Sequence, residues 1–330
     1  DNYRPHLEDA AQYYPQAKQY DDYRRLLEDK NVQGVIIATP LYLHGRMTMD
    51  ALRAGKRVFC EKSMAFTLDE ALEVYNLRKE LGGVLFIGQQ RLFDPKYIKA
   101  MQMIHEGAIG DVVGVRNYWY RNNDWRREVP SPELERHINW RLYSDYSRGL
   151  MTELACHQLQ NGSWAMGMLP ERVMGSGSLI HWDKVDKRDV YDCVTAIFTY
   201  PNGVNMTFES IISNKHFGMG EQILGSKGTI DLVTGMYYTD EPAPKGSGMH
   251  QLVEQIEKGV MSNSVFAGTS WAAETSALAP GMPIMQNVKV VTGESSVGAE
   301  ADGSKELLDA FIHAVITGKQ PEKVLEESYY

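Results

Sequence analysis

The sequence predicts an α/β domain with a doubly wound parallel sheet, followed by an α+β domain with a large, mostly antiparallel sheet. The chain has 330 residues, which is enough for two domains. Short apolar runs alternate with helix-like segments up to about residue 92, and this order is typical of parallel sheets. Beyond that point, turn residues separate alternating strand patterns, which indicates antiparallel hairpins. The expected domains are therefore 1–92 and 93–330, with a long insertion at about 233–303.

In the first domain, strand-like and helix-like segments follow one another as right-handed crossovers require. The strands are β-branched or aromatic runs, as expected of a sheet that is buried on both faces. Thr67 and Glu70 have the spacing of a capping box, and Gly55 stands where a helix C-terminal glycine belongs. In chain order we expect helices at 7–14 and 21–28, a strand at 35–38, a helix at 44–54, a strand at 58–60, a helix at 67–81 and a strand at 84–88.

The second domain combines a few helices with hairpin-forming strands. Residues 112–120 alternate and are aromatic, like a half-exposed strand, and Pro201-Asn202-Gly203 marks a turn between two further strands. The insertion is rich in Gly, Ser, Pro and Met, with one helix expected at 250–258. The other expected elements are helices at 95–106, 149–168 and 304–317 and strands at 173–180, 191–200, 204–213, 222–224 and 229–232.

The composition excludes some classes of partner. The formal net charge is -9, so neither nucleic acid nor an anionic membrane is expected as a partner. No apolar run approaches the roughly 20 residues that cross a bilayer. Cys60, Cys156 and Cys193 form no CxxC or Cys/His cluster and are interpreted as small buried apolar residues, so no metal site is expected. This cysteine usage fits a reducing compartment, and we expect a cytoplasmic protein.

The run from Val58 to Ser63 is the first candidate for chemistry. A short buried strand runs directly into the charge pair Glu61-Lys62, and ligands of open α/β sheets bind at the carboxyl ends of the strands. A surface ion pair that begins a loop is the alternative interpretation of these two residues.

Four motifs, in order along the chain, resemble the Gfo/Idh/MocA oxidoreductases, the relatives of glucose-fructose oxidoreductase and inositol dehydrogenase. The resemblance implies a Rossmann domain, bound NAD or NADP, and hydride transfer at a secondary alcohol of a sugar, cyclitol or related polyol. It also implies a homodimer or homotetramer formed through the exposed face of the antiparallel sheet. The motifs are Ala38-Thr39-Pro40 with His44; Ala51–Lys56 running into Cys60-Glu61-Lys62-Ser63; Gln90-Arg91 with Asp94-Pro95 and Gly107–Asp111; and Gly149 with Glu153 and His157.

The sequence departs from the family pattern at several positions. The first Rossmann strand and its glycine-rich phosphate loop are missing, so we expect the front of the Rossmann domain to lie outside this sequence. The alternative is a real truncation, which should not bind dinucleotide tightly. Ser63 stands where the family has proline, and Glu153 stands where it has aspartate. If the match holds, Asp1 ends the second Rossmann strand, where an acidic side chain binds the adenosine ribose and favours NAD.

The resemblance gives each candidate residue a role. Lys62 would hydrogen-bond the substrate hydroxyl and stabilise the developing alkoxide, and His157 would accept its proton. Glu153, one helical turn before His157, would orient the imidazole or bind a second hydroxyl. The expected cofactor contacts are Asp1, Ala38, Thr39, Pro40, His44, Glu61, Lys62, Gln90 and Arg91, and the expected substrate contacts are Tyr118, Arg121, Trp140 and Arg141.

Structural roles remain open for several of these residues. His157 can be a satisfied core histidine, His44 a neighbour of a helix cap, and Arg91 a hinge arginine paired to a carboxylate. The aromatic residues can belong to the core or to a subunit interface. Two other functions also remain open: an NAD-dependent glycoside hydrolase that works by transient oxidation and elimination, and a non-catalytic binding or scaffold protein with the same fold.

Overall fold

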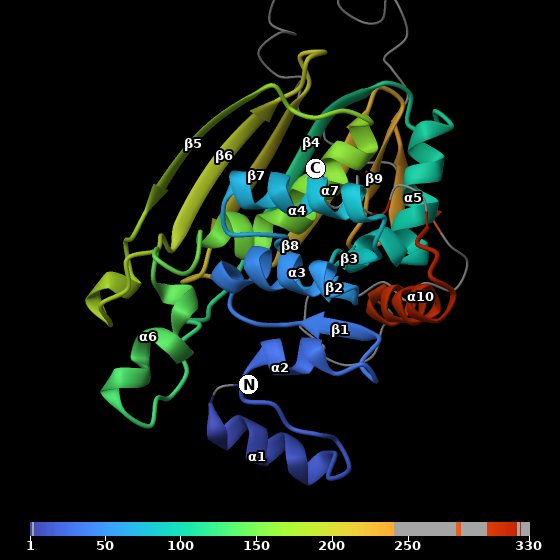
Figure 1. The fold of residues 1–330 in the computed structure, drawn as a ribbon. Coiled ribbons are helices and arrows are strands. Elements are labelled where there is room, and N and C mark those ends of the chain that lie inside the picture. Colours follow the sequence, from blue (N-terminus) through green and yellow to red (C-terminus); the bar gives the residue numbers. More distant parts are fainter. Residues whose placement is uncertain (2, 241–281, 285–301, 322–323, 325–330) are drawn as a thin grey trace, which may run out of the picture.

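Two sheets organise the chain (Figure 1). They are seen in a computed structural model that describes residues 1, 3–240, 282–284, 302–321 and 324. The smaller sheet is parallel and has the order β1-β2-β3, and the larger has the order β11-β10-β9-β8-β4-β7-β6-β5. A parallel sheet followed by a mixed sheet confirms the predicted fold class.

The parallel sheet is covered on both faces, as its apolar strands predict. Val58 and Cys60 pack in the apolar cluster beneath α3 and α4, whereas Phe59 between them packs in a second cluster on the opposite face. The strands are β1 (Gly34–Ile37), β2 (Arg57–Cys60) and β3 (Leu85–Ile87), and the helices on the first face are α2 (Tyr23–Glu28), α3 (His44–Arg53) and α4 (Leu68–Leu81).

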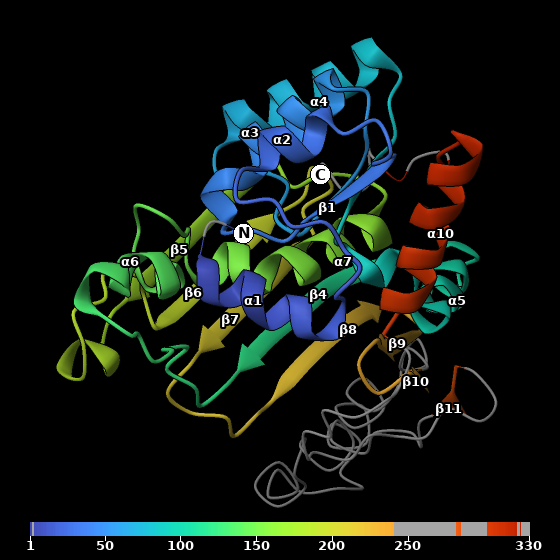
Figure 2. The ribbon, with the colours of Figure 1, turned by 60° about the horizontal axis from the view of Figure 1, so that its bottom comes forward.

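Helix α10 (Ser304–Thr317) covers the other face of the parallel sheet. Phe311 packs its ring edge-on against Phe59 and Phe86, with ring centroids 5.6 and 5.7 Å apart. Figure 2 shows α10 well apart from α3 and α4. The sequence analysis assigned this helix to the 93–330 domain, but the helix completes the core of the parallel sheet.

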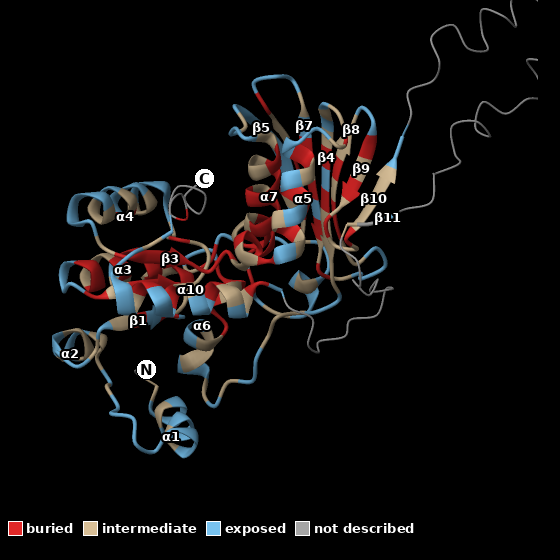
Figure 3. Ribbon diagram, turned by 90° about the vertical axis from the view of Figure 1, so that its right-hand side faces the viewer, coloured by how far each residue is buried: buried red, intermediate tan, exposed pale blue. Residues whose placement is uncertain are grey.

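The large sheet is mostly antiparallel, but β4 and β7 pair in parallel at its centre. Its strands are β4 (Val112–Tyr120), β5 (Arg172–Ser178), β6 (Cys193–Thr199), β7 (Asn205–Ile211), β8 (Met219–Gly225), β9 (Gly228–Asp231), β10 (Met236–Thr239) and β11 (Met282–Pro283). Helices α5 (Pro95–His105) and α7 (Cys156–Met166) lie against one face, which carries the buried residues (Figure 3).

Most sequence-predicted elements are present within one or two residues at each end. Thr67 and Glu70 form the predicted capping box at the start of α4. The helix expected at 149–168 differs: it begins with a π-helical turn (Met151–Ala155) before α7. The sequence analysis did not predict β10 and β11, and the helix expected at 250–258 lies outside the described residues.

Helix α1 (Arg4–Tyr13) buries none of its residues and lies at the edge of the molecule (Figure 3). Asp1, just before it, accepts a hydrogen bond from the Tyr3 N–H and contacts His6 Nδ1. Across the described ranges, every helix is too short or too polar to span a bilayer. The remaining short helices are η1 (Leu41–Leu43), η2 (Gln90–Phe93), η3 (Pro132–Leu134), α6 (Glu135–Ile138), η4 (Trp140–Leu142) and η6 (Trp182–Lys184).

Candidate active site

The end of β2 is joined to the π-helical turn before α7. Lys62 Nζ donates a hydrogen bond of 2.6 Å to the backbone carbonyl of Glu153. Next to it, Ser63 Oγ donates to the Thr152 carbonyl at 3.1 Å. These bonds bring together two sequence motifs that are separated by about ninety residues, and they place Lys62 between the two sheets.

His157 is buried beneath this junction and is oriented by Gln89. Its Nδ1 lies 3.0 Å from Gln89 Oε1. Because an amide oxygen only accepts, Nδ1 carries the proton and Nε2 is left as an acceptor. Burial, together with the charges of Arg91 and Lys62, holds the pKa of His157 well below its ordinary value. The imidazole is therefore neutral at neutral pH, with Nε2 as a hydrogen-bond acceptor.

Glu153 does not orient His157, as one option in the sequence analysis had it. Its carboxylate instead accepts a hydrogen bond of 2.9 Å from Arg141 Nε. The Arg141 guanidinium in turn lies 4.2 Å above the ring of Trp140. Trp140 is itself buried, so it supports Arg141 from below. The reason for the difference is the π-helical turn, which changes the spacing of side chains before α7.

A cavity of about 390 Å³ opens beside Lys62. Four residues that the sequence analysis put in the site line it: Lys62, Glu153, Arg141 and Arg121, which directly follows β4. The loop after β4 supplies residues that the sequence analysis missed, although the arginine-rich run directly after an aromatic strand was a usable signal. The full lining is Lys62, Arg121, Asn123, Trp125, Arg126, Arg127, Arg141, Glu153 and Leu154.

Arg91 has the structural role that the sequence analysis kept as its alternative. It is buried and forms an ion pair with Glu221 of β8. Glu221 also accepts hydrogen bonds from Asn161 Nδ2 and the Tyr97 hydroxyl, at 2.8 and 3.2 Å. This fixed network corrects the expected contact of Arg91 with cofactor or substrate. The neighbouring glutamine that reaches the site is Gln89, one position before the expected Gln90.

Tyr118 also lies apart from the cavity. Side chains alternate along β4, and Trp119 packs on the helix-covered side with the cluster around Leu150 and Leu154. Tyr118 therefore points to the opposite face, where its ring meets Tyr120 and Phe217. The sequence shows that side chains alternate between the two faces of β4, but it does not show which face of the sheet the site occupies.

The carboxyl end of β1 offers groups suited to a cofactor. The hydroxyl oxygen of Thr39 is buried and has no partner among the described residues. His44 is buried between two carbonyls, with Nε2 2.9 Å from Thr39 O and Nδ1 2.7 Å from Ser63 O. It thereby ties the ends of β1 and β2 together. An unpaired buried hydroxyl next to Ala38 and Pro40 is what a bound polar group would satisfy.

Glu61 lies at the same edge of the sheet. Its carboxylate packs directly on Gly88, where a Cβ atom would come within 2.7 Å of Glu61 Oε2. Glycine after β3 thus makes room for Glu61, and the edge formed by Thr39 and Glu61 fits a dinucleotide along the strand ends.

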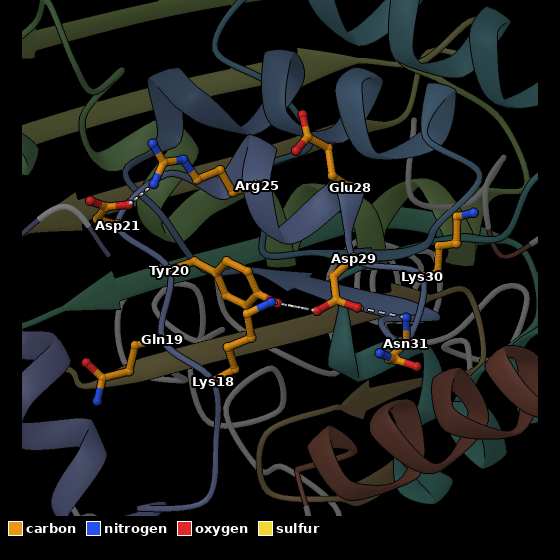
Figure 4. Close-up of a pocket in the computed structure, with 9 residues that line it drawn as sticks. All are labelled: Lys18, Gln19, Tyr20, Asp21, Arg25, Glu28, Asp29, Lys30 and Asn31. Carbon is orange, nitrogen blue, oxygen red and sulfur yellow. Dashed lines mark hydrogen bonds and ion pairs between the residues drawn. The ribbon is translucent and has the colours of Figure 1, made fainter.

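A second hollow, of about 760 Å³, lies beside α2 and contains none of the predicted site residues (Figure 4). Its cations and anions balance, and its central carboxylate, Asp29, accepts hydrogen bonds from Lys18 and Tyr20. In the part of the chain that the structure describes, no group of three or more His, Cys, Asp and Glu side chains is arranged to hold a metal ion.

A Rossmann-type sheet with polar groups at the carboxyl ends of its strands, joined to a second domain built on a mixed sheet, fits the class of two-domain dinucleotide-binding proteins. Two family models identify the branch: an oxidoreductase family with an NAD-binding Rossmann fold matches residues 1–89, and a GFO/IDH/MocA C-terminal domain matches residues 97–231. The chain belongs to the Gfo/Idh/MocA oxidoreductase family.

Individual relatives are distant. Myo-inositol 2-dehydrogenase of Thermotoga maritima is 26% identical over 70% of this chain and 66% of its own length. An uncharacterized oxidoreductase of Schizosaccharomyces pombe is 27% identical over 64% of this chain and 54% of its own length. The chain thus spans less than two thirds of either relative. A levoglucosan dehydrogenase solved in complex with NADH superposes with a TM-score of 0.70, at 17% identity, over 100% of this chain and 82% of that one.

Proposed function

We propose that the protein is an NAD-dependent dehydrogenase, with NADP as the alternative cofactor, that oxidises a secondary alcohol of a sugar, cyclitol or related polyol. The observation that supports this most directly is Lys62: its Nζ lies at the strand ends, is held by the Glu153 carbonyl and lines the cavity. Relatives named as dehydrogenases of inositol and levoglucosan support the substrate class.

Thr39, Pro40 and Glu61 would hold the cofactor, and its nicotinamide would supply the hydride acceptor. Lys62 donates one of its remaining N–H bonds to the substrate hydroxyl and stabilises the alkoxide as it forms. The neutral His157 accepts the hydroxyl proton at Nε2, which makes no hydrogen bond among the described residues. Glu153 and Arg141 hold one another in place at the cavity wall.

The relatives reported above are named as oxidoreductases or dehydrogenases, so neither the glycoside hydrolase nor the scaffold alternative gains support. We also propose a reducing, cytoplasmic location, supported by the absence of any disulfide at Cys60, Cys156 and Cys193.

The test is cofactor reduction by the full-length protein. With NAD or NADP and a panel of polyols, absorbance of the reduced nicotinamide should rise. Lys62→Met should lower kcat by about 10²–10⁴-fold, because it removes the group that stabilises the alkoxide. Lys99→Met, an exposed lysine on α5, is the matched control and should leave kcat unchanged. No reduction of either cofactor and no nucleotide binding would overturn the proposal.

A further inference from the structure

The cavity beside Lys62 is strongly basic in a protein whose net charge is -9. Five cations and one carboxylate line it. The cations are Lys62, Arg121, Arg126, Arg127 and Arg141, and the carboxylate is that of Glu153. Positive charge gathered in one cavity of a negatively charged protein attracts anions to that cavity.

Nearby carboxylates neutralise only part of this charge. Arg141 pairs with Glu153 at 2.9 Å. Arg126 lies between Glu135 and Asp186, at 2.8 and 3.0 Å. Asp186 is shared with a further arginine, Arg188, so its charge is already divided between two cations.

Two arginines and the lysine keep their charge unbalanced. Within the described ranges, Arg121 and Arg127 form no ion pair, and Lys62 bonds to an uncharged carbonyl. Arg121 is partly buried, with its guanidinium 5.8 Å from the centre of the Trp119 ring. Burial lowers the pKa of Arg121 because water that would solvate the charge is excluded. Half-burying a cation that has no ion-pair partner costs free energy, and a bound anion offsets that cost.

The loop that carries these arginines is fixed before any ligand arrives. Trp125 has a φ of 59°, in the left-handed region, and its N–H is held at 2.7 Å by Asn123 Oδ1. Asn139 Oδ1 holds the Arg127 N–H at 2.7 Å, and the two carboxylates around Arg126 anchor its side chain. The arrangement is preorganised, so little ordering is needed on binding.

We propose that the substrate is an anionic polyol, a monosaccharide-sized molecule whose carboxylate or phosphate is bound by Arg121 and Arg127 while its reacting hydroxyl meets Lys62. The inference rests on the proposed dehydrogenase function and names its substrate class. Guanidinium groups suit both anions, since they donate two parallel hydrogen bonds to carboxylate or phosphate oxygens. A volume of about 390 Å³ lies at the small end of the range for ligand pockets and suits one sugar ring.

The test compares myo-inositol and glucose with glucuronate and glucose-6-phosphate, using the full-length protein and its preferred cofactor. At least one anionic probe should have a kcat/KM about tenfold or more above the neutral probes. Whether glucuronate or glucose-6-phosphate is preferred identifies the anion as carboxylate or phosphate. Equal or better use of the neutral probes would overturn the inference and leave the dehydrogenase function standing.

Arg121→Gln should lower kcat/KM for the anionic probe by about ten- to a hundredfold, mainly through KM, and lower it far less for the neutral probes. Arg172→Gln, an exposed arginine on β5, is the control. Titration calorimetry of the same probes in the presence of NADH gives a readout without turnover. If the dehydrogenase function is wrong, the probes will bind without reacting. If the anionic probes do not bind, or bind equally well to Arg121→Gln, this inference is overturned.

Discussion

At the scale of single residues, His157 shows how surroundings select a protonation state. The ring is almost fully buried and lies near two cations, Arg91 and Lys62, each of which opposes a further positive charge. Gln89 fixes the proton on Nδ1. The side chain is therefore a neutral acceptor under the conditions in which a dehydrogenase oxidises an alcohol.

The same burial makes stability depend on pH. The unfolded chain protonates His157 near its ordinary pKa of about 6.5, whereas the folded protein does so only at a much lower pH. Between these values the unfolded state binds more protons, so the free energy of unfolding falls as pH decreases below about 6.5, by at most about 1.4 kcal/mol per pH unit from this group. In urea denaturation from pH 7 to pH 5, His157→Gln should flatten this slope, and the exposed control His137→Gln should not. Parallel curves for wild type and His157→Gln would contradict the assignment.

At the scale of elements, the sequence predicted what local patterns encode. Buried strands, the capping box at Thr67 and the ends of α4 follow from periodicity and capping chemistry. The parallel pairing of β4 with β7 could not be predicted from the sequence, because the neighbour of each strand depends on how the whole sheet packs. The same limit applies to the site: the motifs put Lys62 and Glu153 in one site, and Lys62 Nζ bonds the Glu153 carbonyl, but the π-helical turn before α7 has no clear local signal.

Helix α10 gives an element-scale prediction. Phe311 is buried between Phe59 and Phe86, whereas the next residue, Ile312, is 54% exposed. Phe311→Ala should lower the free energy of unfolding by about 3–5 kcal/mol, since it leaves a cavity in the core of the parallel sheet. Ile312→Ala on the same helix should cost less than about 1 kcal/mol. Chemical denaturation of both variants measures the difference, and equal losses would show that α10 does not complete this core.

At the scale of the whole molecule, the described residues cover one face of the large sheet and leave the other open. Helices α5 and α7 cover the face that carries the core (Figure 3). On the other face, strand register places Met174, Ile197, Thr207 and Arg116 in one row across four strands. Tyr118, Tyr120 and Phe217 form an aromatic group beside this row, and Phe217 is 64% exposed. Met174 on the edge strand β5 is 70% exposed.

We propose that two copies pair through this face, because a two-fold axis would bring Met174, Ile197 and the aromatic group of one copy against those of the other. Ile197→Arg adds a further positive charge in the same row as Arg116, which pairing would bury, so it should shift the protein toward monomer. Analytical ultracentrifugation of the full-length protein at several concentrations measures the shift. Leu72→Arg, a partly exposed position on α4 on the other domain, should leave the association unchanged. A wild-type protein that sediments as a monomer at every concentration, or an Ile197→Arg variant that still pairs, would rule out this face as the interface.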